Sequence, residues 1–190
     1  MPEKRVILCE GIHDVYFFSL LLEQKQIKHK TVTNEELGKK QNSETLVIRD
    51  FINPRKGKGI RYLIKDEGGN LRCIENFKVL YEQREGSFVM FLCLDSDSGN
   101  LKRLRRETSD RFREDILVPM SDNFHLTKSK TKHSVFFIPD SLESQVRAIT
   151  GKNIDRTDRD HLKKALQKFI ETCREQEIDW FIELETVLFN

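Results

Sequence analysis

Short apolar runs alternate with segments of helical periodicity along most of this chain. These runs lie at residues 5–9, 60–66, 87–95 and 134–139, and the third contains seven consecutive apolar residues. A run of this kind is typical of a strand that is covered on both faces of a sheet. These four runs are therefore predicted to be the strands of the fold, and the run at 87–95 is the clearest of them.

Helices are predicted between and after these strands. Apolar residues recur at helical spacing, or charged residues dominate a continuous stretch, at residues 13–26, 70–83, 100–116, 142–150 and 158–176. Strands that alternate with helices indicate a parallel sheet with right-handed crossovers. The predicted fold is α/β, an open and mainly parallel Rossmann-like sheet flanked by helices. It fills a domain over residues 1–150, and residues 151–190 add a C-terminal helical extension.

Two further segments are harder to assign. Residues 28–59 are mostly polar and include the basic loop INPRKGKG, so we expect only an edge strand or a short helix there. A linker containing KSKTKH leads into the strand at 134–139. The tail at 178–189 is apolar enough to pack, either on the body of the protein or on a second subunit as a homodimer.

Composition narrows the class of protein. Hydrophobic residues make up 37% of the 190 residues and include thirteen Phe, which is enough for a core and argues against disorder of the whole chain. Charged residues make up 34% but nearly cancel, leaving a formal net charge of +2. The overall charge therefore does not mark a nucleic-acid-binding protein, although local clusters can still bind phosphates.

Cysteine use and targeting signals point to an intracellular location. The four cysteines are far apart in the sequence and form no CxxC pair, so neither a disulfide framework nor a zinc site is expected. The N-terminal apolar stretch is too short for a signal peptide, and no run approaches membrane-spanning length. We expect a soluble, cytoplasmic protein with no membrane partner.

Acidic residues follow two of the predicted strands directly. Glu10 ends the first strand, and Asp14 comes one helical turn later. Asp95 and Asp97 end the third strand. Ligands of open parallel sheets bind outside the carboxyl ends of the strands, so neighbouring strands would bring these acids together. Such a cluster is costly without a cation, and its oxygen ligands suit Mg²⁺ or Mn²⁺.

The motifs VILCEGIHDVYFF and FLCLDSDSG resemble the Toprim domain, which topoisomerases, bacterial primases, small ribonucleases and OLD-type nucleases share. The resemblance covers residues 5–148 and is greatest to small stand-alone Toprim proteins, with an insertion within residues 28–59. It implies that Glu10 acts as general acid or base in phosphodiester chemistry. It also implies that Asp95 and Asp97 hold Mg²⁺ or Mn²⁺, with support from Asp14. The segment FFIPDSLESQ resembles the same group of proteins and adds Glu143 as a ligand for a second metal.

Simpler interpretations stand beside these. An acid such as Asp14 in a first helical turn is commonly explained by the helix dipole, and Glu10 alone could be a solvated loop residue. His13 is expected to be an exposed first-turn residue. The basic side chains at 102–106 are as well explained by a solvated helix face as by contacts with phosphates. The preferred candidates for contacts with DNA or RNA are Arg55, Lys56, Lys58, Lys128, Lys130 and Lys132.

The sequence therefore favours a Toprim nuclease that acts on DNA or RNA with Mg²⁺ or Mn²⁺. The alternative is a non-catalytic module that binds metal and nucleic acid, or works with a partner ATPase, primase or topoisomerase component. A third hypothesis is an ordinary α/β domain whose acids have no shared role.

Overall fold

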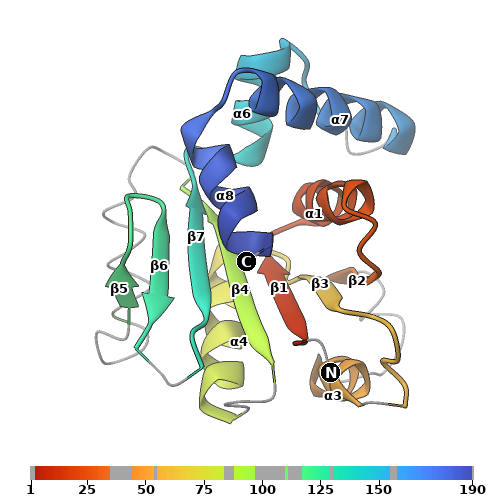
Figure 1. Ribbon diagram of the computed structural model, residues 1–190, viewed down its shortest axis with the longest axis vertical. Coiled ribbons are helices and arrows are strands. Elements are labelled where there is room, and N and C mark those ends of the chain that lie inside the picture. Colours follow the sequence, from red (N-terminus) through yellow and green to blue (C-terminus); the bar gives the residue numbers. More distant parts are fainter. Residues whose placement is uncertain are drawn as a thin grey trace.

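The computed structural model describes residues 3–34, 44–53, 55–83, 88–96, 110, 117–128, 131–154 and 158–189. Figure 1 shows a sheet with helices packed against it. The strands are β1 (Arg5–Cys9), β2 (His29–Val32), β3 (Tyr62–Asp66), β4 (Val89–Asp95), β5 (Leu117–Pro119), β6 (Phe124–Thr127) and β7 (Ser134–Ile138). The helices are α1 (Ile12–Gln24), α3 (Glu44–Ile52), α4 (Asn70–Gln83), α6 (Leu142–Thr150), α7 (Arg159–Glu175) and α8 (Asp179–Phe189).

The described strands form one mixed, mainly parallel sheet in the order β2-β3-β1-β4-β7-β6-β5. The first five strands of this order are parallel, while β6 runs antiparallel to β7 and β5 antiparallel to β6. The predicted strands correspond to β1, β3, β4 and β7, so the mainly parallel α/β sheet is confirmed. From β1 the chain goes to the edge strand β2, returns to β3 between β2 and β1, and then crosses to β4 on the other side of β1. The β1–β4 pair is therefore where the strand order reverses.

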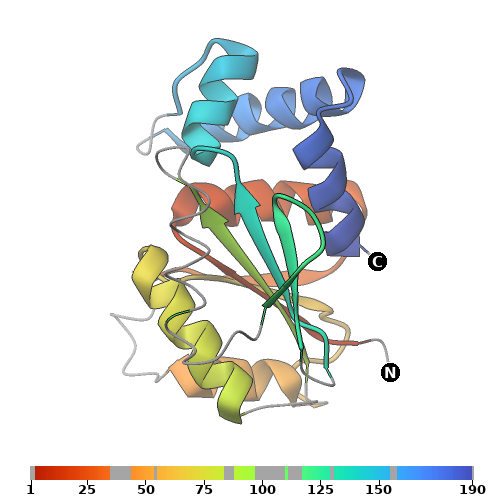
Figure 2. The ribbon, with the colours of Figure 1, turned by 90° about the vertical axis from the view of Figure 1, so that its left-hand side faces the viewer.

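Both faces of the sheet are covered, which explains why the central strands are apolar without alternation. In β1, Ile7 and Cys9 pack into the core formed with α1, α6, α7 and α8. Val6 and Leu8 pack into the second core, formed with α3 and α4. Successive strand residues point to opposite faces, so each face receives every second side chain. Figure 2 shows α1 and the C-terminal helices on one side of the sheet and α3 and α4 on the other.

The linker expected before the last parallel strand is instead a hairpin. Residues 117–127 include β5 and β6, which extend the sheet in the antiparallel direction. These strands are three and four residues long, and β5 ends in Pro119, so their sequence carries too few apolar positions to predict a strand. The helix predicted over residues 100–116 lies outside the described residues except at Asp110.

Residues 28–59 contain both of the elements that were considered for them. β2 is an edge strand of the sheet, and α3 is a short helix on the face that carries α4. Residues 35–43 lie outside the described part of the chain.

The apolar tail packs on the body of the protein. Phe181, Leu184 and Leu188 of α8 are buried in the same core as α1 and α7. The Tyr62 hydroxyl donates a hydrogen bond to the Leu188 carbonyl over 2.9 Å, and Arg5 donates to the same carbonyl over 2.8 Å. These bonds attach the end of the chain to β1 and β3. Among the described residues, no helix is long and apolar enough to cross a membrane.

Candidate functional site

The site is built where β1 and β4 lie side by side. Arg5 to Leu8 pair in parallel with Val89 to Leu92, so both strands end at the same edge of the sheet. Glu10 follows β1 directly, and its Oε1 accepts a hydrogen bond of 2.7 Å from the backbone N–H of Asp95. Asp95 Oδ1 in turn accepts from the N–H of Leu142, at the start of α6, over 3.3 Å. The Glu10 carboxylate therefore lies against the backbone of Asp95, and both acids line one cleft at the point where the strand order reverses.

Asp14 is held by the turn that joins β1 to α1. It is the third residue of α1, and its Oδ2 accepts from the backbone N–H groups of Glu10 over 3.1 Å and Gly11 over 3.0 Å. An acid at this position satisfies N–H groups that a helix leaves without intrahelical partners. Asp14 is only 6% exposed, and burial raises its pKa to about 7, with a further rise from Glu143 opposed by the hydrogen bonds. Its clearest role is thus to fix the loop that carries Glu10.

Asp66, which ends the neighbouring strand β3, was not among the predicted site residues. Asp66 pairs in register with Cys9, one residue before Glu10, and is buried beside the same cleft. Its carboxylate accepts from Gly68 N–H over 2.8 Å and from Asn34 N–H over 3.4 Å. Gly68 has a φ of +75°, which a residue with a side chain rarely adopts. The pattern is the same as at Glu10, an apolar strand ending in an acid and a glycine turn, and it could have identified Asp66.

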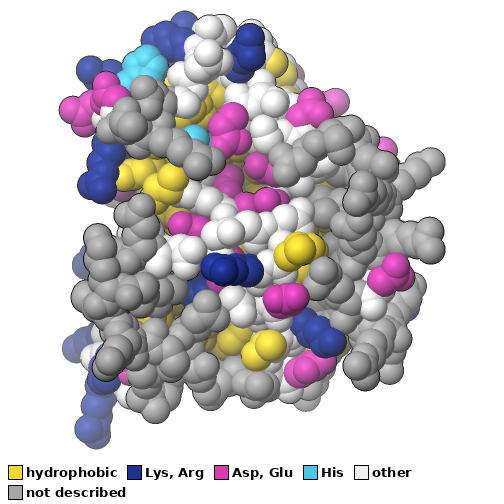
Figure 3. All heavy atoms as spheres, turned by 180° about the vertical axis from the view of Figure 1, so that it is seen from behind, with side chains coloured by type: hydrophobic (Ala, Val, Ile, Leu, Met, Phe, Trp, Pro, Cys, Tyr) yellow, Lys and Arg dark blue, Asp and Glu magenta, His cyan; other side chains and the backbone are white. Residues whose placement is uncertain are grey.

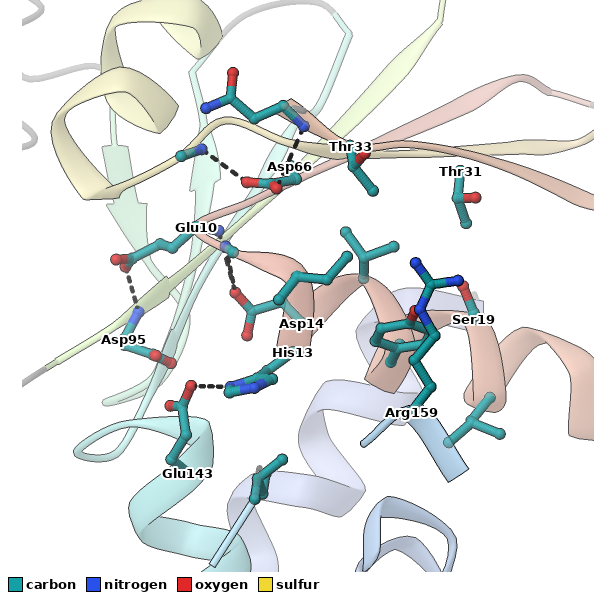
Figure 4. Close-up of a pocket in the computed structure, with 18 of the residues that line it drawn as sticks. Glu10, His13, Asp14, Ser19, Thr31, Thr33, Asp66, Asp95, Glu143 and Arg159 are labelled. Atoms are coloured by element: carbon teal, nitrogen blue, oxygen red, sulfur yellow. Dashed lines mark hydrogen bonds and ion pairs between the residues drawn. The ribbon is translucent and has the colours of Figure 1, made fainter. Parts of the chain in front are cut away.

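The expectation that His13 is exposed is wrong. His13 is only 5% exposed because α6 covers the start of α1, and its Nδ1 pairs with Glu143 Oε1. Glu143 is therefore brought to the same cleft as Glu10, but its carboxylate is engaged by the histidine. Figure 4 shows this pair beside Asp14, with Glu10 and Asp95 next to them.

These side chains line a cleft of about 1340 Å³. Its walls come from the carboxyl ends of β1, β3 and β4, one face of α1, the edge strand β2, and the first turns of α6 and α7. Among the described residues, six carboxylates line it, from Glu10, Asp14, Glu23, Asp66, Asp95 and Glu143. Figure 3 shows acidic side chains gathered around a hollow on the face opposite to that of Figure 1.

Two cations, Arg159 and Lys163, also line the cleft. They lie one turn apart on α7, whose first turn Asp158 caps by accepting from the N–H groups of Asp160 and His161. Neither was a candidate from the sequence, because α7 there was only an amphipathic helix of the C-terminal extension. Its position above α1 is a property of the tertiary structure.

The cleft offers carboxylate oxygens as its candidate ligands for a divalent metal ion. Among the described residues, no three His, Cys, Asp or Glu side chains converge in a geometry that could hold a metal ion. Asp97, the second acid of the predicted pair, lies outside the described residues. Mg²⁺ usually takes only one or two protein carboxylates and completes its shell with water and phosphate oxygens. Of the residues predicted as metal ligands, Asp14, Asp95 and Glu143 line the cleft, and their carboxylate oxygens are of the kind that this ion binds.

The basic loops proposed for phosphate contacts lie away from the cleft. Arg55, Lys56 and Lys58 precede β3, and Lys128 and Lys132 precede β7, so both loops lie at the amino edge of the parallel strands. The carboxylates lie at the carboxyl edge. Lys56 is also paired with Asp50, at 2.9 Å. Lys130 lies outside the described residues. The structure therefore does not bring these lysines together with Glu10 and Asp95.

The chain was compared with protein families, curated proteins and solved structures. No protein-family model matches the chain, and no curated protein and no solved structure matches it.

Proposed function

We propose that this protein carries out metal-dependent phosphodiester chemistry on nucleic acid, as a Toprim-like nuclease. The observation that supports the proposal most directly is the hydrogen bond from the Asp95 amide to the Glu10 carboxylate, which brings these two acidic residues together at the ends of β1 and β4. The sequence resemblance to Toprim domains assigns its functional acids to the same two positions. A large cleft opens from this point, with room for a polymeric substrate.

Each side chain has a separate role in this proposal. Asp95, with Asp97, binds Mg²⁺ or Mn²⁺, which when bound would neutralise charge on the phosphate under attack. Glu10 accepts a proton from the attacking water or donates one to the leaving oxygen. Asp14 holds the Glu10 backbone in place through its two N–H contacts. Glu143 lines the cleft on the α6 side and supports a second ion.

The alternative is a module that binds metal and nucleic acid, or a partner ATPase, without cutting. One observation favours it: the carboxylates of Glu10, Asp95 and Asp66 each accept a backbone N–H in the described conformation. For catalysis, Glu10 would have to exchange its bond to the Asp95 amide for one to a reacting oxygen.

A cleavage assay tests the proposal and separates the two functions. Labelled DNA and RNA are incubated with Mn²⁺ and either the wild-type protein or the Glu10→Gln variant. Glutamine can still accept the Asp95 N–H, so the fold should be retained while proton transfer is lost. We expect the variant to be slower by roughly 100-fold or more, because a general acid or base contributes about that much.

Glu171→Gln is the matched control, since Glu171 is an exposed acid of α7 outside the cleft. It should cut at the wild-type rate. If wild-type protein cuts no faster than Glu10→Gln, the nuclease proposal fails. Calorimetric titration with Mn²⁺ then distinguishes a binding module, which retains a stoichiometric site lost in Asp95→Asn, from a domain without a metal site.

A further inference from the structure

The cleft extends well beyond the carboxylates, along α1 toward the edge of the sheet. Tyr16 and Ser19 line it from α1, and Thr31 and Thr33 line it from β2 and the residue after it. Arg159 and Lys163 line it from α7. We call these six residues the α1 arm of the cleft. Figure 4 shows Arg159 reaching from α7 toward Ser19, with Thr31 and Thr33 on the far side of the same space.

Helix geometry makes the α1 arm continuous with the carboxylate end. His13, Tyr16, Leu20 and Glu23 line the cleft and follow each other at helical spacing on one face of α1. From Ile12 to Glu23 this face is about 16 Å long at 1.5 Å per residue. A ligand whose phosphate lies at Glu10 and Asp95 can therefore continue along α1 into this arm.

The chemistry of the arm suits a nucleic-acid strand. Arg159 and Lys163 are the cations that line the described cleft, and both are exposed to solvent. Tyr16 is partly buried against the core and also lines the cleft. Cations that follow the backbone together with an aromatic ring that stacks on a base are the usual combination for single-stranded nucleic acid. The hydroxyls of Ser19, Thr31 and Thr33 add hydrogen-bonding groups for the sugar.

We propose that the α1 arm binds a single-stranded segment of nucleic acid, with Arg159 and Lys163 contacting its phosphates and Tyr16 stacking on a base. This inference rests on the proposed function in one respect: the strand is taken to place a phosphodiester bond at Glu10 and Asp95. A duplex keeps its bases stacked inside, so it cannot offer Tyr16 a base while a phosphate contacts α7. The six carboxylates oppose a polyanion, so binding should require a divalent cation at the carboxylate end.

Binding is measured by fluorescence anisotropy with a short labelled oligothymidylate and with its RNA counterpart. All variants carry Glu10→Gln, so that the strand is not cut during the measurement. All samples contain Mn²⁺, because binding is expected to require a divalent cation. We expect the double variant Arg159→Gln with Lys163→Gln to bind the strand roughly 25-fold more weakly near 0.1 M salt. The plot of the logarithm of the association constant against the logarithm of the salt concentration should become less steep by about 1.4. Each lost phosphate contact on a single strand contributes about 0.7 to this slope.

The matched control is Lys164→Gln with Lys168→Gln. These lysines have the same spacing on the same helix and are also exposed, but they do not line the cleft. The control should bind as its parent does. Tyr16→Leu should weaken binding roughly tenfold, whereas Tyr16→Phe should not. Equal losses in the two double variants, or a duplex bound as tightly as the single strand, would overturn the inference.

The results can refute this inference and the nuclease proposal independently of each other. If wild-type protein cuts with Mn²⁺ but the α7 variants bind normally, and also cut normally when made without Glu10→Gln, only the α1 arm has been assigned wrongly. If the α7 variants lose binding while wild-type protein never cuts, the arm stands and the catalytic proposal falls.

Discussion

The two edges of the parallel strands are built in opposite ways. At the carboxyl edge, Asp14 and Asp66 are buried and accept backbone N–H groups. At the amino edge, Lys56 is exposed and pairs with a neighbouring acid in water. The edge that carries Glu10 thus holds its charges in fixed positions at a cost in stability, while the other edge leaves them solvated. Only a fixed, partly desolvated set of charges has the arrangement that chemistry requires.

The largest expected effect concerns buried charge at the carboxyl edge. Lys65 and Glu67, each 1% exposed, form an ion pair under α4, and Asn76 donates to the same carboxylate over 2.6 Å. Lys65→Met removes the cation that pairs with the buried glutamate and should reduce the free energy of unfolding by about 3–5 kcal/mol. Urea denaturation measures this. The double variant Lys65→Met with Glu67→Leu removes both charges and should be clearly more stable than the single variant. If the double variant is as unstable as Lys65→Met, the loss of stability does not come from an uncompensated buried charge.

Next comes the pH response of Asp14. Its pKa is about 7 in the folded protein because of burial, and near 3.9 in the unfolded chain, so the folded state holds the extra proton between these values. Stability should therefore fall by roughly 3 kcal/mol as the pH rises from 4 to 7, and stay lower above that. Asp14→Asn keeps an oxygen for the two N–H groups and should remove this dependence. Denaturation in EDTA across this pH range tests it, and a variant as pH-dependent as the wild type would contradict it.

The amino edge should respond to pH with the opposite sign. His133, which precedes β7 and is 1% exposed, accepts the Met90 N–H at its Nδ1 over 3.1 Å. Burial lowers its pKa to about 4, against about 6.5 in the unfolded chain. The unfolded state therefore binds the proton first, and stability should fall as the pH drops below 6.5, by about 2 kcal/mol at pH 5. His133→Gln should be less stable at neutral pH but lose less on acidification. Thermal melts at several pH values decide this.

The smallest effect is expected for the exposed pair at the amino edge. Lys56 and Asp50 are 60% and 40% exposed, and such pairs contribute at most about 1 kcal/mol. Asp50→Asn should change the free energy of unfolding by less than this, and less still at high salt. A loss comparable to that of Lys65→Met would mean that the two edges do not differ as described.

Much of the sheet was predictable because its signal is local. The apolar runs that became β1, β3, β4 and β7 are long enough to show that both faces are covered. The hairpin of β5 and β6 was missed because three or four residues with polar neighbours carry no periodicity. Glu10 and Asp95 were found because an acid at the end of such a run is unusual in sequence. Asp66 obeys the same rule, with Glu67 directly after it, and was still not among the predicted site residues.

The rest of the site depended on how helices dock. His13 was predicted to be exposed because its own helix provides no reason to bury it, and only the packing of α6 does so. Arg159 and Lys163 were ordinary charged positions of an amphipathic helix until α7 was placed above α1. The basic loops at Lys56 and Lys132 looked suitable for phosphate, but parallel strand direction puts them at the edge remote from Glu10.

By itself the sequence determined that buried strands end in acids and alternate with helices. Hydrophobic runs and turn residues set the local secondary structure, which depends mainly on residues close together in the chain. Tertiary structure alone decided that β1 lies beside β4, that Asp66 joins their edge, and that α7 brings two cations to face the carboxylates. Strand order and helix docking are set by which buried faces fit together. That fit involves residues more than a hundred positions apart, such as His13 and Glu143, and leaves no periodic pattern in the sequence.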